Sequence, residues 1–91
     1  MAELRREIDR AVQLIAYASY VGNHPDGICC DGANIWVANY WDNSVTKLRA
    51  ADGATMGTFD VRGAGPYTIC FDGHSLWVAN HLTDSVGKLT P

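Results

Sequence analysis

Short runs of apolar residues alternate with turn signals along most of this chain. Within each run, β-branched and aromatic residues predominate or alternate with polar ones, which is typical of β-strands. The dipeptide Asp31-Gly32 and the tripeptide Ala51-Asp52-Gly53 separate runs in the way that tight turns separate strands. The predicted strands occupy 28–30, 35–40, 44–49 and 55–61.

The same pattern returns 41 residues later. Between the segments that start at Pro25 and Pro66, 13 of 26 aligned positions are identical without a gap, including the tetrapeptides at 36–39 and 77–80. A unit of about 40 residues with four short strands is typical of a β-propeller blade. The sequence therefore predicts two consecutive blades, the first over 25–61 and the second, with three strands only, over 66–91.

The repeated residues match the pattern of a known propeller repeat. The pattern P-x-x-I-x-x-D-G-x-x-[IL]-W-V-A-N-x-x-x-x-S-V-x-K-L, present twice within residues 25–91, resembles the YVTN-type propeller repeat of virginiamycin B lyase-like proteins. The resemblance implies a propeller fold. Because propellers host many activities, it implies little about function.

The N-terminal residues predict a helix followed by a strand. Apolar positions over 1–13 recur at helical spacing, which predicts an amphipathic helix or leader. The 41-residue register places 15–22 on 56–63, so 14–21 is predicted to be an outer strand detached from its own blade. In the alternative interpretation the helix continues to about Ala18 and this strand does not exist.

Two blades are too few to close a propeller, so the predicted fold is completed by copies. We expect an all-β unit over 14–91 that forms a six-bladed ring as a homotrimer, or an eight-bladed ring as a homotetramer. Strand 14–21 of one copy would pair with the third strand of the second blade in another. The residues expected to close the ring are Leu14, Ile15, Tyr17, Tyr20, Val86, Lys88 and Leu89.

Most repeated residues are expected to serve the fold. Trp36 and Trp77 are expected to fill the space between blades, and the Asp-Gly pairs to form turns. Asn39 and Asn80 end the middle strands, where an amide can bond loop backbone groups. The repeated lysines are expected at the surface, with their stems along apolar groups.

The composition and charge of the chain limit the kinds of partner that we expect it to bind. The 91 residues have a net charge of −3 and no run of Lys or Arg, which argues against nucleic acid and anionic lipid as partners. The strongly apolar stretch 11–21 is too short to span a bilayer. The three cysteines are an odd number without scaffold spacing, so we expect small buried thiols and a reducing, cytoplasmic location.

One group of loop residues is a candidate binding site. The loops before the first strand and after the second strand of each blade emerge on one face of a propeller, which places aromatic rings, imidazoles and carboxylates together. A small-molecule or carbohydrate pocket uses such groups for stacking and orientation. The candidate ligand-binding residues are His24, Tyr40, Trp41, Asp42, His81 and Asp84.

Two classes of function follow, with a third possibility beside them. The first is a non-enzymatic binding or scaffold ring, with no cofactor, no metal and no assigned catalytic residue. The second is a metal-assisted lyase or hydrolase, which the resemblance implies and for which His24 and His81 would be the base or metal ligands. The third is a propeller fragment or a repeat engineered for assembly.

Overall fold

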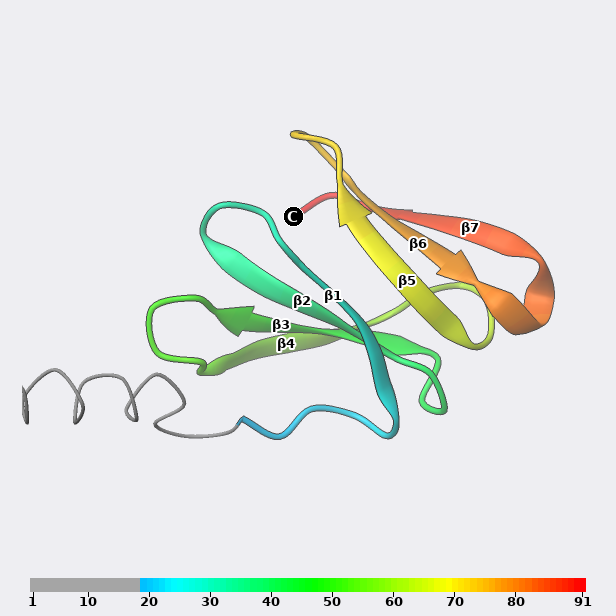
Figure 1. Ribbon diagram of the computed structural model, residues 1–91, viewed down its shortest axis with the longest axis horizontal. Coiled ribbons are helices and arrows are strands. Elements are labelled where there is room, and N and C mark those ends of the chain that lie inside the picture. The colour runs from blue at the N-terminus through cyan, green and yellow to red at the C-terminus, as the bar shows by residue number, and fades with distance from the viewer. Residues whose placement is uncertain (1–18) are drawn as a thin grey trace, which may run out of the picture.

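The computed structural model describes residues 19–91, which form two antiparallel β-sheets (Figure 1). The strands of the first sheet are β1 (Pro25–Cys30), β2 (Asn34–Asn39), β3 (Ser44–Arg49) and β4 (Thr55–Asp60). Those of the second are β5 (Pro66–Phe71), β6 (Leu76–Asn80) and β7 (Ser85–Leu89), with a 3-10 turn η2 (His81–Thr83) between the last two. The prediction of an all-β fold is confirmed in this part of the chain.

Each sheet is a meander in which neighbours in sequence are neighbours in space. The order is β1-β2-β3-β4 in the first sheet and β5-β6-β7 in the second. The two sheets also keep the same register, since Trp36 lies opposite Lys47 and Trp77 lies opposite Lys88. The 41-residue repeat is therefore a repeat of structure and not only of sequence.

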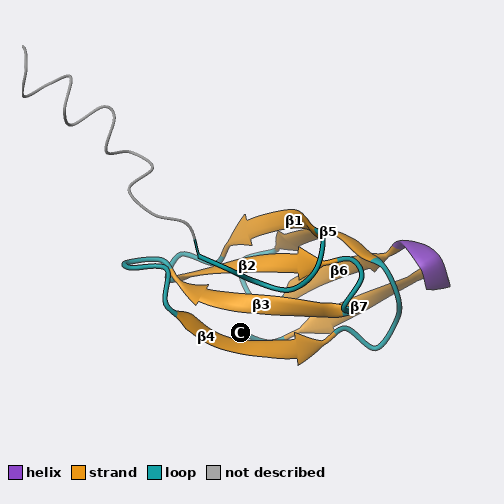
Figure 2. Cartoon of the chain, turned by 90° about the horizontal axis from the view of Figure 1, so that it is seen from below, coloured by secondary structure: helices purple, strands orange, loops and turns teal. Residues whose placement is uncertain are grey.

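The hydrophobic core lies between the two sheets. Trp36, Ala38 and Val45 point from one face of the first sheet, and Ile69, Leu76 and Val78 from the facing side of the second; all six are buried in one cluster with Val61. The inner strands β1 and β5 lie side by side, as both ribbon views show (Figure 2). Because side chains alternate along each strand, the two sheets contribute opposite faces of the repeat to this core: Trp36 belongs to it, whereas the equivalent Trp77 does not.

Gly27 permits the close approach of these inner strands. A Cβ atom at this position would lie 2.7 Å from the carbonyl oxygen of Tyr67 and 3.0 Å from Cα of Thr68. Such distances are shorter than a side chain tolerates, so a residue without a side chain is needed where β1 crosses β5.

Little of the predicted N-terminal region falls in the described part of the chain. The predicted helix over 1–13 and the positions 14–18 of the predicted strand lie outside it. Residues 19–21 are described and are not in a strand. Ser19 donates its hydroxyl to the carbonyl of Gly53, and the chain then runs to the other end of the first sheet, where Asn23 bonds Asp42.

No helix among the described residues has the length and apolar character needed to cross a bilayer.

Candidate functional site

The candidate residues lie at the end of the sheets where β2 turns into β3 and β6 into β7. Backbone hydrogen bonds fix both loops to the segment before each sheet: Tyr40 donates to the carbonyl of His24 at 2.9 Å, and His81 to that of Gly65 at 2.8 Å. His24 and Gly65 are equivalent in the repeat, and both adopt a left-handed conformation, with φ of 55° and 66°. The repeat thus builds the same loop pair twice.

Aromatic and imidazole rings form a connected row across this end. Tyr40 is at its centre, with ring centroids 4.7 Å from Trp41, 5.6 Å from His24 and 6.4 Å from His81. His81 is in turn 6.1 Å from Tyr67. These distances are typical of edge-to-face and tilted aromatic pairs. The row joins the two sheets, because His81 and Tyr67 belong to the second.

The two candidate carboxylates play different parts. Both oxygens of Asp42 accept hydrogen bonds from Asn23, from the backbone at 2.8 Å and from the side-chain amide at 3.1 Å. Asp42 therefore holds the loop in place. Asp84 adopts a left-handed conformation after η2 and lines a hollow of about 270 Å³ together with Tyr67 and His81.

The row thus contains four of the six candidate residues, His24, Tyr40, Trp41 and His81, and adds Tyr67. Asp26 pairs with His24, with 3.5 Å between Nε2 and the carboxylate. Among the described residues, no three His, Cys, Asp or Glu side chains lie together in a way that could hold a metal ion.

At the opposite end, each Asp-Gly turn binds the tryptophan of the next strand. One oxygen of Asp31 accepts the backbone N–H groups of Ala33 and Asn34, and the other accepts the indole N–H of Trp36 at 2.8 Å. Asp72 and Trp77 form the same bond at 2.8 Å. The Asp residue therefore sets the turn and the orientation of the large ring together, a link that the spacing of five residues offered and that we did not predict.

These bonds stabilise the charged carboxylates. Backbone N–H of Ser75 is the main cause that lowers the pKa of Asp72 to about 2, followed by the indole of Trp77 and the backbone of His74. For Asp31, partial burial acts to raise the pKa, but the hydrogen bonds from Trp36, Ala33 and Asn34 outweigh it and the pKa is lowered.

The lysines lie over the same rings. Nζ of Lys47 is 5.3 Å from the ring centroid of Trp36, and Nζ of Lys88 is 5.2 Å from that of Trp77. Lys47 is half-buried at the contact of the two sheets and Lys88 is exposed. The predicted surface position therefore describes Lys88 better than Lys47.

The strand-ending asparagines do bond backbone groups, as their position predicted. Asn39 accepts the N–H of Gly22 and donates to the hydroxyls of Ser44 and Thr46. Asn80 donates to Ser85 and to the carbonyl of Val61, at 3.4 Å, while its buried Oδ1 has no hydrogen-bond partner. Gly87 stands where the first sheet has Thr46 and offers Asn80 no hydroxyl, and the N–H of Gly63 does not bond Asn80 as the equivalent Gly22 bonds Asn39.

Trp77 and the cysteines differ from expectation. Trp77 points away from the core, because its neighbours Leu76 and Val78 occupy the face of β6 that packs on the first sheet, and no described residue of the chain forms a sheet on its own side. The cysteines are free thiols: Cys29 is half-buried, and burial raises its pKa, whereas Cys30 and Cys70 are exposed. The small buried thiols that we predicted are thus absent at two of three positions.

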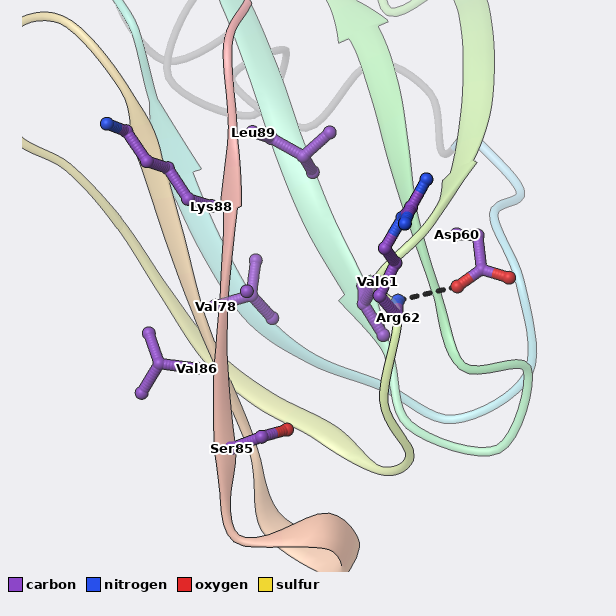
Figure 3. A pocket seen from close by; sticks show the side chains of 9 residues that line it. Asp60, Val61, Arg62, Val78, Ser85, Val86, Lys88 and Leu89 are labelled. Atoms are coloured by element: carbon purple, nitrogen blue, oxygen red, sulfur yellow. Dashed lines mark hydrogen bonds between the residues drawn. The ribbon is translucent and has the colours of Figure 1, made fainter.

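β7 is an open edge. It pairs with β6 on one side, and no described residue pairs with its other side, where the first sheet has β4. A hollow of about 280 Å³ follows it, lined by β7 itself, by Val78 and by the segment Asp60–Arg62. In Figure 3, Val86 and Lys88 point to one side of β7, and Ser85 and Leu89 to the other. Because residues of both faces line it, the hollow runs along the free edge.

Some of the residues predicted to close the ring lie in the described part of the chain. Val86, Lys88 and Leu89 all belong to the open edge strand. Tyr20 is 92% exposed in the described structure. Leu14, Ile15 and Tyr17 lie outside the described residues.

A comparison of the chain with protein-family models and with curated proteins finds no match.

Proposed function

We propose that this chain is a two-blade subunit of a β-propeller, which closes a ring with copies of itself and serves as a non-enzymatic scaffold for binding. The observation that carries the proposal is the open edge of β7 beside two sheets stacked face to face. A second sheet of three strands, built on the register of a first sheet of four, lacks one outer strand.

The missing strand has a candidate in the sequence. Position 14 corresponds to Thr55, where β4 begins, so 14–19 corresponds to the whole of β4. Unpaired N–H and C=O groups at a sheet edge readily accept a further strand. Addition of 14–19 from another copy would complete the second sheet. A head-to-tail contact of this kind gives a closed ring when the rotation per copy fits.

The expected ring has three copies. Three chains give six blades and four give eight, both within the usual range of propellers. The smaller ring is preferred here because it needs fewer copies. The blades would be of the YVTN type, on the pattern shared by both repeats.

The binding face would be the end of the ring that carries the aromatic row. In a ring, each copy would contribute the same aromatic row around one opening, with Asp84 beside it. The row consists of His24, Tyr40, Trp41, Tyr67 and His81. Flat rings and imidazoles suit a small polar ligand with an apolar face, such as a carbohydrate.

Light scattering tests the proposal on the full chain and on a version that begins at Val21. We expect the mass of three chains, or four, for the full chain, and the mass of one chain or an aggregate for the shortened version. A full chain with the mass of a single copy at all concentrations would refute it.

A further inference from the structure

Equivalent residues of the two repeats differ strongly in their exposure to solvent. Val45 is 0% exposed and its equivalent Val86 is 66% exposed; Trp36 is 2% exposed and Trp77 is 37% exposed. In the other direction, Ile69 is 8% exposed and its equivalent Ile28 is 67% exposed. The residue types are identical, so composition does not explain the difference.

The way in which the two sheets pack on each other explains this difference in exposure. The first sheet buries the face of Trp36 and Val45 against the second sheet, and the second buries the face of Ile69 against the first. What remains outward is the face of the second sheet with Trp77, Ala79 and Val86, which we name the W77 face. On the other side lies the face of the first sheet with Ile28 and the half-buried Ile35, which we name the I28 face. This face is open at Ile28, whereas Val37, Thr46 and Leu48 on the same face are already buried within the chain.

The two outward faces are copies of the two that already fit together. The W77 face repeats the face of Trp36, Ala38 and Val45, and the I28 face repeats that of Ile69 and Leu76. A contact between the W77 face of one chain and the I28 face of the next would therefore repeat the contact inside the chain.

We infer that the W77 face of one copy docks on the I28 face of another, in the arrangement that the first and second sheets adopt within one chain. The inference rests on the proposed ring and identifies its second contact, beside the addition of a strand to β7. Tyr20 fits the same scheme, because it is equivalent to Val61, which is 3% exposed in the core.

The contact between sheets within one chain and the proposed contact between copies differ at one position. Gly27 allows β1 and β5 to touch within a chain, whereas the equivalent residue of the W77 face is Thr68. The threonine side chain holds the inner strands of neighbouring copies further apart than β1 and β5. The ring would then alternate close and wider contacts between blades, and its symmetry would be that of the chains rather than that of the blades.

Complementary blocking of the two faces tests this inference. Val86→Asp blocks the W77 face and leaves the I28 face intact, and Ile28→Asp does the reverse. Both positions are well exposed in the single chain, so neither substitution should unfold it, and circular dichroism would verify this. We expect each variant alone to have the mass of one chain, and an equimolar mixture to form a one-to-one pair.

A control substitution outside both faces should leave the assembly unchanged. Ala51→Asp is the control, because this exposed residue lies in the turn between β3 and β4, outside both faces, and it should leave the mass of the assembly unchanged. A self-associating face would instead leave one of the two blocked variants as a dimer by itself, and that result would overturn the inference. An assembly of unchanged mass in both blocked variants would refute the docking faces but not the ring. A wild-type chain that never associates would refute the ring as well.

Discussion

Trp36 and Val45 in the first sheet are enclosed, whereas Trp77 and Val86, 41 residues later, face outward. The sheets share register, turn geometry and the Asp–Trp bond, and they differ in what lies against each face. The difference teaches that the burial of equivalent residues in this repeat depends on which sheet lies against their face. Within one chain each sheet covers one face of the other, and the proposed contact with another copy would cover Trp77 and Val86 of the second sheet.

Tryptophan substitutions should give the largest contrast. Trp36→Ala removes a ring from the core and should lower the free energy of unfolding by about 3–5 kcal/mol, enough to unfold a small domain. Trp77→Ala should cost the single chain far less, because its ring is partly in water already. Chemical denaturation at low protein concentration measures both.

A milder pair keeps this comparison measurable if Trp36→Ala does not fold. Trp36→Phe should destabilise the single chain more than Trp77→Phe does, since only the first leaves buried space unfilled. Equal losses in the two variants would contradict the account of burial.

The strand-ending asparagines should differ in the same direction. Asn39→Ala breaks bonds to Gly22, Ser44 and Thr46 and leaves polar groups without partners, which should cost about 1–3 kcal/mol. Asn80→Ala should cost less, because the hydrogen bonds of Asn80 are longer and its buried Oδ1 is unpaired already. A larger loss at Asn80 than at Asn39, measured by urea denaturation, would go against this ranking.

Acid should weaken both sheets through the turn carboxylates. The folded pKa of Asp72 is about 2 and that of Asp31 is also lowered, so the folded state binds fewer protons than the unfolded state. Their contribution is complete above about pH 4, the range of an unfolded aspartate, and for Asp72 it is lost as the pH falls through about 2. Thermal melts across this window should show less acid sensitivity in Asp72→Asn than in the wild type.

Trp41 should give the smallest effect. It is exposed, and its equivalent in the second sheet is Leu82, so Trp41→Leu should change the free energy of unfolding by no more than about 0.5 kcal/mol. The same variant should weaken carbohydrate binding, if the aromatic row binds such a ligand, which glycan-array screening would reveal. A large loss of stability would mean that Trp41 supports the fold.

Strand positions and sheet order followed from the sequence because local turn chemistry decides them. Asp31-Gly32 and Asp72-Gly73 lie within a few residues of the strands that they join, and Gly32 and Gly73 take the positive φ that their place in the turn requires. The exposure of Trp77 did not follow, because burial depends on which sheet lies opposite, and identical sequences gave no sign of the difference.

The loop residues were predictable as a group but not in their roles. The repeat placed His24, Tyr40 and His81 at one end, where the structure connects them. It gave no indication that Asp42 bonds Asn23, a contact between two sites that are 19 residues apart. Contacts between distant segments depend on how the sheets stack, and the repeat pattern describes each sheet separately.

The exposure of Trp77 in solution tests the central claim most directly. The chain has three tryptophans, so 5-fluorotryptophan labelling gives three fluorine resonances, which Trp41→Leu and Trp77→Phe assign. The shift between light and heavy water reports how far each ring meets solvent. At the highest concentration that the protein tolerates, the account predicts a small shift for Trp77, like that of the buried Trp36. A large shift for Trp77 at every concentration, like that of Trp41, would contradict the claim that another copy covers the second sheet.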